Sequence, residues 1–318
     1  MKVLRLHAPG DLRLHDEPDP EPGPGEVVLR VTGVGLCGSD RHWVAEGAIG
    51  DAGLARPLVL GHEFAATIES GPRGGERVAV DPAIPCGVCP TCARGLEHLC
   101  PQVEFAGHSL DGALRERMAW PDRLAHTLPD SISDAEAPLL EPLGVALHAL
   151  DLGHAGPGTR AAVVGCGPVG LLIVEALLAA GAAQVVASDP LPRRLEAALA
   201  RGAVAEGSGV DVAFEVAGED GAVAAAIELV RPGGRLVLVG IPDGDRTTIP
   251  AAAARRRGLT ILVSRRMKAT DLPRAIELVS SGRVELGGLV TERRPLVEAH
   301  DAFDSLLERR GLKVVVEP

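Results

Sequence analysis

Residues 161–189 read AAVVGCGPVGLLIVEALLAAGAAQVVASD, and this stretch decides the fold of one half of the chain. An apolar run leads into the pattern G-x-G-x-x-G, a helix-length segment of alanine and leucine follows, and Gln184–Ser188 is a second apolar run. A strand, a glycine-rich turn, a helix and a second strand in this order predict a βαβ unit with parallel strands. The glycines allow a tight turn, and they let a pyrophosphate approach the N-terminus of the helix.

A carboxylate follows the second strand at the position where nucleotide specificity is set. Asp189 lies about 20 residues after the last glycine, where an acidic side chain binds both ribose hydroxyls and repels a 2′-phosphate. We therefore expect NAD, although Arg193 or Arg194 would accommodate the phosphate of NADP. A packing turn followed by a solvated aspartate is the structural alternative. The expected cofactor-binding residues are Gly165, Gly167, Pro168, Val169, Gly170, Asp189, Arg194 and Val239.

The alternation of strands and helices continues after this unit. Strand-like runs at Asp211–Val216, Arg235–Val239 and Leu259–Val263 alternate with helical material such as Gly221–Val230. Repeated βα units predict an α/β domain with a doubly wound parallel sheet that helices cover on both faces.

The segments on either side have a different character. Short alternating strands such as Val27–Val34 and Arg77–Val80, separated by glycine and proline clusters, make the first part of the chain largely β. An amphipathic helix at Leu272–Ser280 and a strand at Leu312–Val316 return to this style. We therefore expect one domain of residues 1–143 and 264–318, interrupted by a dinucleotide-binding domain of residues 144–263.

Four cysteines on a loop rich in proline and glycine predict a metal site. Cys86, Cys89, Cys92 and Cys100 are separated by two, two and seven residues. This spacing is typical of a tetrahedral thiolate site, most simply a closed structural Zn²⁺. An iron–sulfur centre and disulfides are the alternatives. We expect no secretory leader, because residues 1–15 alternate apolar with polar and charged side chains, and this makes disulfides the weaker alternative.

A second group of metal-type ligands lies upstream of the cysteine loop. Cys37 opens the sequence Cys-Gly-Ser-Asp, and His62 and Glu63 close the sequence Gly-His-Glu. A thiolate, an imidazole and a carboxylate supply three ligands and leave one position open, as a catalytic zinc requires. Alone, a cysteine is more often a small buried hydrophobe, and a histidine is more often a hydrogen-bonded core residue. Only the combination favours a metal site.

Composition limits the partners of this chain. Hydrophobic residues make up 46% and charged residues 24% of 318, which is the composition of a globular chain long enough for two domains. The net charge of −11 argues against nucleic acid or an anionic membrane as the main partner. The longest apolar stretch, Ala161–Val174, contains glycines and a proline and is too short to span a membrane. We expect a cytoplasmic protein that acts on a small molecule in a pocket without tyrosine, since the chain has none.

Taken together, these residues resemble the zinc-containing medium-chain alcohol dehydrogenase family, and within it the sorbitol dehydrogenase branch. The resemblance spans essentially the whole chain and includes Glu141-Pro142-Leu143 and Leu312-Lys313-Val314. It implies an α/β fold in which a GroES-like, mostly β catalytic domain is interrupted by a Rossmann domain with a doubly wound parallel sheet. It also implies a homodimer or homotetramer. The segment between Gly202 and Asp211 is shorter than the family usually has, which trims the helix and strand after Asp189.

The resemblance implies the arrangement of the open metal site. Cys37, His62, Glu63 and a water would hold the zinc, with Glu141 bound to that water or to the metal itself. Asp40 would orient His62 from behind. The four-cysteine loop would hold a second, structural zinc.

The resemblance also implies residues that handle the substrate. Ser39 would pass on the proton of the alcohol, and His42 would lie further along the relay toward bulk water, unless it is an ordinary polar loop residue. Arg266 resembles a family arginine that holds the distal hydroxyls of a polyol.

We therefore expect a zinc-dependent oxidoreductase that transfers a hydride from a secondary alcohol of a polyol or cyclitol to NAD and releases the ketone. Zinc lowers the pKa of the alcohol, and the nicotinamide carries the redox chemistry. One alternative is the same fold acting on an amino alcohol, as threonine dehydrogenase does, or on an aldose. Another is a zinc- and NAD-binding sensor without turnover. The sensor predicts a damaged ligand set, and the ligand set here is complete.

Overall fold

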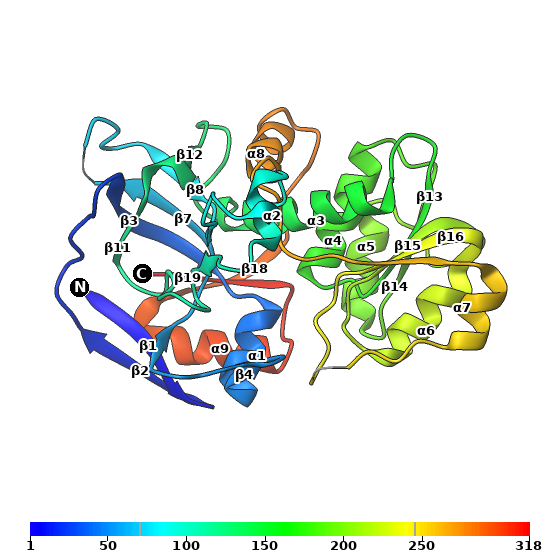
Figure 1. Cartoon of the computed structure of the whole chain (residues 1–318), viewed down its shortest axis with the longest axis horizontal. Coiled ribbons are helices and arrows are strands. Elements are labelled where there is room, and N and C mark those ends of the chain that lie inside the picture. Colours follow the sequence, from blue (N-terminus) through cyan, green and yellow to red (C-terminus); the bar gives the residue numbers. More distant parts are fainter. Residues whose placement is uncertain (70, 245) are drawn as a thin grey trace. The chain divides into compact units, whose positions relative to one another are not determined.

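The computed structural model describes residues 1–69, 71–244 and 246–318, and its contacts divide the chain into two units (Figure 1). The first unit comprises Met1–Glu141, Lys268–Ser280 and Leu286–Pro318. The second comprises Pro142–Met267 and Ser281–Glu285. The expected boundaries after residues 143 and 263 lie within four residues of these divisions, whereas the short return at Ser281–Glu285 was not expected.

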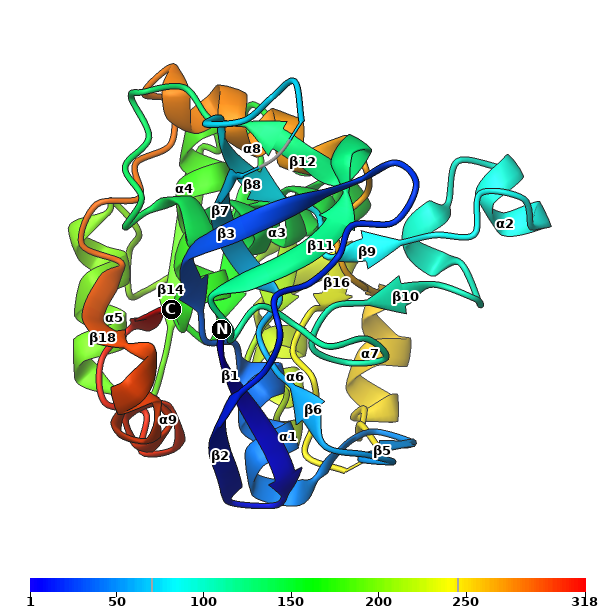
Figure 2. The same ribbon diagram turned by 90° about the vertical axis from the view of Figure 1, so that its left-hand side faces the viewer.

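A seven-stranded sheet forms the centre of the first unit (Figure 2). Its strand order is β12-β8-β7-β3-β19-β18, and β11 also pairs with β3. Only β18 and β19 pair in parallel. The strands are β3 (Glu26–Gly35), β7 (Glu63–Ile68), β8 (Arg77–Val80), β11 (Arg117–Pro121), β12 (Ala125–Thr127), β18 (Val290–Pro295) and β19 (Lys313–Glu317). The last strand of the chain thus lies beside β3, near the N-terminus in sequence.

Shorter elements complete this unit. The smaller strands are β1 (Lys2–Ala8), β2 (Asp11–Asp16), β4 (Ala48–Ile49), β5 (Ala52–Gly53), β6 (Leu58–Val59), β9 (Ala83–Ile84) and β10 (Glu104–Phe105). The helices are α1 (Gly38–Glu46), α2 (Pro90–Ala93), α8 (Asp271–Ser280) and α9 (Ala299–Leu307), with 3₁₀ turns at Glu97–Leu99, Asp122–Leu124, Ala137–Leu139 and Leu296–Glu298. Alternate residues of the strands face one core, where the rings of Phe64 and Trp120 meet edge to face.

The second unit contains the predicted parallel sheet. Its five strands run in the order β14-β13-β15-β16-β17, and all four neighbouring pairs are parallel. The connection from β13 to β14 runs toward one edge of the sheet, and the connection from β15 to β16 runs toward the other. Because both crossovers are right-handed, their helices lie on opposite faces of the sheet. The strands are β13 (Arg160–Val164), β14 (Gln184–Ser188), β15 (Val210–Glu215), β16 (Val230–Leu238) and β17 (Thr260–Val263). The helices are α3 (Leu140–Gly153), α4 (Pro168–Ala179), α5 (Pro192–Ala200), α6 (Asp220–Leu229) and α7 (Ala251–Arg257).

The sheet is shortened at one edge. Doubly wound sheets of this type have the strand order 3-2-1-4-5-6. Here β13 takes the place of strand 1 and β14 that of strand 2, and β14 lies at the edge because strand 3 is missing. A single bridge between Val186 and Val204 takes the place of the third strand. Residues 205–209 then return directly to β15, and Gly207 lies so close to Val186 that a Cβ would come within 2.6 Å of that side chain. The domain therefore lacks the third strand and the helix that would follow that strand, whereas α5, before the short segment, has nine residues.

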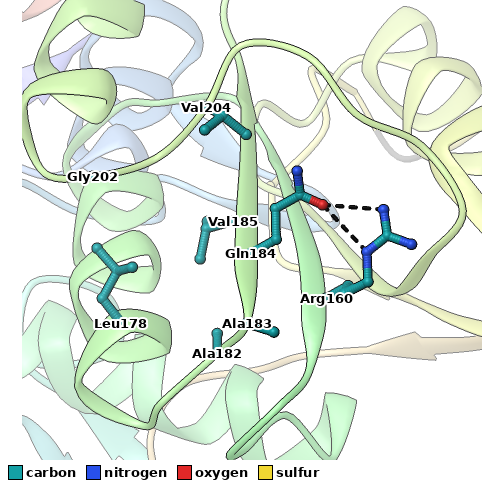
Figure 3. A pocket seen from close by; sticks show the side chains of 8 residues that line it. All are labelled: Arg160, Leu178, Ala182, Ala183, Gln184, Val185, Gly202 and Val204. Carbon is teal, nitrogen blue, oxygen red and sulfur yellow. Dashed lines mark hydrogen bonds between the residues drawn. The ribbon is translucent and has the colours of Figure 1, made fainter.

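A hollow of about 420 Å³ opens beside this edge (Figure 3). The guanidinium of Arg160 donates to the amide oxygen of its register partner Gln184 at 3.1 and 3.2 Å, and it also donates to the carbonyl of Ser208 at 3.1 Å. Arg160 therefore fastens the short loop to the first residues of β13 and β14.

Candidate zinc and nucleotide sites

Three predicted ligands meet in the first unit. Cys37 caps the N-terminus of α1, while His62 immediately precedes Glu63, the first residue of β7. Their ligand atoms all lie within 4.8 Å of one another, and His62 and Glu63 are buried. Residues separated by a helix and several short strands thus converge on one point.

A capping interaction at α1 holds Cys37 and places Asp40 beside His62. The fully buried Asp40 accepts a hydrogen bond through Oδ2 from the backbone N–H of Cys37 at 2.9 Å. Its other oxygen, Oδ1, lies 3.8 Å from Nδ1 of His62. Asp40 therefore binds the backbone of Cys37 and lies close to the imidazole of His62, which fits the role expected for it. The helix N-terminus adds a positive potential that favours a thiolate at Cys37.

A lysine that sequence reasoning did not assign to the site supports the third ligand. Lys313, on β19, donates from Nζ to Oε2 of Glu63 at 2.5 Å and to the carbonyl of Leu36 at 3.0 Å. Burial lowers the pKa of Lys313, but the charges of Glu63 and Cys37 outweigh burial and raise the pKa above its usual value. The sequence feature that could have revealed this role of Lys313 is a single lysine at the start of an otherwise apolar strand.

Burial also controls the protonation of the acidic groups. Burial and, after it, the neighbouring Glu63 carboxylate raise the pKa of the Cys37 thiol to about 12. The pKa of Glu141, at the start of α3, is raised to about 8, and burial is the largest cause. The charges of Glu63 and Cys37 add to this shift, while His62 and Lys313 oppose it, so Glu141 is electrostatically part of the site.

These residues fit a zinc ion. The second oxygen of Glu63, Oε1, is buried and has no hydrogen-bond partner among the residues that the structure describes. Thiolate, imidazole and carboxylate are zinc ligands, and a divalent cation would replace the proton that burial keeps on Cys37. An open position for a substrate oxygen would remain, because the three residues supply three ligands.

Two further predicted residues follow along α1. The hydroxyl of Ser39 lies 3.4 Å from Nε2 of His62. His42 is buried one turn further, and its Nδ1 lies 3.1 Å from Oε1 of Glu46, whose side chain is 43% exposed. Residues three apart lie on the same face of a helix, so Ser39 and His42 form a polar line that leads from His62 toward solvent.

The four-cysteine loop has the geometry of a second, closed site. The measured Sγ to Sγ distances are 3.5, 3.6, 3.9 and 4.0 Å. Four sulfurs at about 2.3 Å from one zinc would lie about 3.8 Å apart in a tetrahedron. All six cysteines are free, and these distances are far longer than a disulfide bond. The loop therefore fits a zinc ion with four thiolate ligands.

The glycine-rich turn of the second unit has no room for side chains. A Cβ on Gly165 would lie 2.8 Å from the backbone nitrogen of Ala217, and one on Gly170 would lie 2.0 Å from the carbonyl oxygen of Gly165. Gly165 also has a φ of 99°, which favours glycine. Gly167 is the N-cap of α4, and Pro168 and Val169 form its first turn. A glycine-rich helix N-terminus of this kind is suited to binding a pyrophosphate.

Asp189 closes this turn from the end of β14. Its two carboxylate oxygens accept hydrogen bonds from the backbone N–H groups of Cys166 and Leu191, each at 2.8 Å. Arg194 lies near Gly167, since a Cβ there would come within 3.7 Å of its guanidinium. Val239 follows β16 and donates its N–H to Glu215 at 2.8 Å. These residues gather at the carboxyl ends of the strands, where dinucleotides bind.

Arg266 lies in the second unit and is half-buried. Its φ of 59° is unusual for a residue other than glycine, and such strain often accompanies function. Its contact with a substrate stays a prediction.

Fold and sites together define a zinc-containing medium-chain alcohol dehydrogenase, and comparison with known proteins shows that the chain belongs to this family. Residues 23–130 match the alcohol dehydrogenase GroES-like domain, and residues 203–281 match the zinc-binding dehydrogenase domain. The chain is 35% identical to sorbitol dehydrogenase of Bacillus subtilis over 344 aligned positions, covering 100% of this chain and 97% of that protein. It is 36% identical to sorbitol dehydrogenase of Homo sapiens, covering 99% and 95%. The crystal structure of L-idonate 5-dehydrogenase from Escherichia coli matches with a TM-score of 0.90 at 25% identity, covering 100% and 98%.

The comparisons confirm the predicted family, the fold class and the enzymatic nature of the chain. It is an alcohol dehydrogenase with Zn²⁺ and NAD as cofactors, which sets the sensor alternative aside. Across the described ranges, the helices are too short or too polar to cross a membrane.

Proposed function

We propose that this enzyme oxidises a secondary alcohol group of a polyol or cyclitol to the ketone and transfers the hydride to NAD. The observation that carries this proposal is the buried set of Cys37, His62 and Glu63, whose ligand atoms lie within 4.8 Å of one another. Zinc held there would lower the pKa of an alcohol, and bound NAD would supply the acceptor for the hydride. The relatives named sorbitol dehydrogenase support a polyol as substrate.

Residues of α1 carry the proton of the alcohol away from the site. Ser39 lies 3.4 Å from His62, so its hydroxyl is at the ligand set and accepts the proton of the substrate. His42 receives it one turn further along the helix, and Glu46 at 3.1 Å connects His42 with solvent. A hydroxyl and an imidazole are suited to this transfer, because each can both donate and accept a proton.

Glu141 favours a substrate with neighbouring hydroxyls. Burial keeps Glu141 mostly protonated, but the positive charge of a bound zinc would favour its carboxylate form, and a second carboxylate beside Cys37 and Glu63 would then limit how far the metal acidifies an alcohol. In compensation, Glu141 accepts a hydrogen bond from a substrate hydroxyl or a water. A plain alkyl alcohol offers no second hydroxyl for this contact. Arg266 would hold the distal hydroxyls of the same substrate.

We also propose a homodimer or homotetramer in the reducing environment of the cytoplasm. Large apolar side chains support the association: Val88 in the cysteine loop is 86% exposed, and Val263 on the edge strand β17 is 75% exposed. Six free cysteines support the reducing compartment. Sedimentation of the purified enzyme measures the oligomer directly.

A substrate panel tests the proposed reaction. NAD reduction is followed with polyols, cyclitols, amino alcohols, aldoses and ethanol, and Cys37→Ala enzyme serves as the blank. We expect vicinal polyols or cyclitols to have a kcat/KM at least about 100-fold higher than ethanol, since only they can use the acid–base group at Glu141. Ethanol oxidised as well as any polyol, or an amino alcohol preferred over all others, would contradict the proposal.

A further inference from the structure

Three neighbouring strands of the first unit's sheet place Glu63, Gly35 and Lys313 close together on one face. Glu63 on β7 is the register partner of Gly35 on β3, and Gly35 is the register partner of Val315 on β19. Partners in adjacent strands present their side chains on the same face. Lys313 lies two residues before Val315, so it belongs to that face as well.

The glycine in the middle strand leaves a path for the side chain of Glu63. A Cβ on Gly35 would lie 2.4 Å from Oε2 of Glu63 and 3.3 Å from its Cβ. The φ of Gly35 is not in the positive range, so the backbone does not require glycine there. Glycine is required for lack of space, because the carboxylate of Glu63 crosses directly over the main chain of β3 and leaves no room for a Cβ.

Beyond Gly35 the carboxylate meets the ammonium group of Lys313. Nζ of Lys313 lies 2.5 Å from Oε2 of Glu63, and the two side chains are 2% and 1% exposed. A second bond from Nζ to the carbonyl of Leu36, at 3.0 Å, fixes the lysine on the main chain of β3. A buried lysine with both contacts holds the carboxylate in one orientation.

The two oxygens of Glu63 therefore have different surroundings. Lys313 occupies Oε2, whereas Oε1 is buried without a hydrogen-bond partner in the described part of the chain. A carboxylate free to turn could bind a zinc ion with both oxygens and fill the position that a substrate needs. With one oxygen engaged by Lys313, only the other is available to the metal.

We propose that Gly35 and Lys313 are positioning residues that hold Glu63 as a one-oxygen zinc ligand and thereby keep the fourth coordination position open. This inference rests on the ligand set of the proposed function. Replacing a residue that hydrogen-bonds to a metal ligand typically lowers metal affinity or activity by about 10- to 100-fold. Neither residue needs to touch the substrate for this effect.

The test compares the full-length enzyme with Lys313→Met, Lys313→Arg and Gly35→Ala. Gly53→Ala is the matched control, because it is also a strand glycine of the first unit but has open space where the Cβ would be added. Zinc affinity is measured by competition with a chelator, and the cobalt-substituted proteins give absorption spectra that report the ligands of the metal. We expect Lys313→Met and Gly35→Ala to weaken the catalytic zinc about tenfold or more and to change the cobalt spectrum. Lys313→Arg should partly restore both, and Gly53→Ala should match wild type.

Zinc affinity within about threefold of wild type and an unchanged cobalt spectrum in both Lys313→Met and Gly35→Ala would overturn the inference. If Lys313→Met does not fold, Gly35→Ala carries the comparison by itself, with Gly53→Ala as its control. His62→Ala separates this inference from the ligand set on which it rests. If that variant keeps both zinc ions, the ligand set is wrong. If it loses one while Lys313→Met and Gly35→Ala keep both, the ligand set stands and only the positioning role falls.

Discussion

The two zinc regions of this chain are built in opposite ways. The closed site takes four thiolates from one loop of residues 86–100, and its ligands need little from the rest of the fold. The open site takes three different ligands from two elements, and a lysine 250 residues away in sequence supports one of them. The closed site therefore serves stability. We propose that the open site keeps a coordination position free and that it needs the surrounding residues to do so.

The largest effect is expected from removing a ligand of the open site. Cys37→Ala should lower turnover by at least about a thousandfold, because the metal that acidifies the alcohol is lost. The fold should change little, since the closed site and both sheets are untouched. Steady-state NAD reduction and circular dichroism measure the two halves of this prediction. Substantial activity in a variant that has lost its open-site zinc would break the distinction between the regions.

Glu141→Gln should have the next largest effect. We expect kcat to fall by about 100-fold or more with polyols, the scale of lost acid–base help, while zinc content stays at the wild-type value. Steady-state kinetics and metal analysis of the same preparation test both points. If kcat stays within a few-fold of wild type, Glu141 has no part in the reaction at the open site and no longer supports a polyol as the substrate.

A smaller effect is expected in the second unit, where no metal is involved. Asp189→Gly should weaken NAD binding by about tenfold and improve NADP, because the carboxylate that binds the ribose hydroxyls and repels the 2′-phosphate is gone. Titration of nucleotide fluorescence measures both affinities, and zinc content should not change. Wild-type enzyme that uses NADP as well as NAD would contradict this assignment and point to Arg193 or Arg194 instead.

The smallest effect on chemistry is expected at the closed site. Cys89→Ala should lower Tm by about 5 °C or more, because a structural zinc contributes folding free energy. Turnover per folded chain should remain close to wild type. Differential scanning calorimetry and active-site titration separate the two quantities. A loss of kcat without a loss of Tm would assign the cysteine loop to catalysis.

The sequence predicted what short stretches of chain determine by themselves. The βαβ unit around Gly165 and the cysteine loop were both readable, because their residues are neighbours in sequence and their spacing expresses the chemistry directly. The candidate ligands Cys37, His62 and Glu63 were also singled out, since each lies in a short motif, and the structure brings them together. The position of Lys313 in the site was not, because it depends on β19 pairing with β3.

Register and edges explain the remaining differences. A glycine such as Gly35 looks like an ordinary strand residue until the pairing of three strands places Glu63 across it. The resemblance to the family predicted that the helix and the strand after Asp189 are both trimmed. The strand is reduced to one bridge at Val204, whereas the helix α5 still has nine residues. Both features follow from contacts between strands, which no local sequence pattern records.

Metal analysis of the fully loaded enzyme shows whether the chain has two separate zinc sites. We predict two zinc ions per chain in wild type and one in each of Cys37→Ala and Cys89→Ala, with turnover lost only in the first and thermal stability lost mainly in the second. One zinc ion per chain in fully loaded wild-type enzyme would contradict the account of two separate zinc regions.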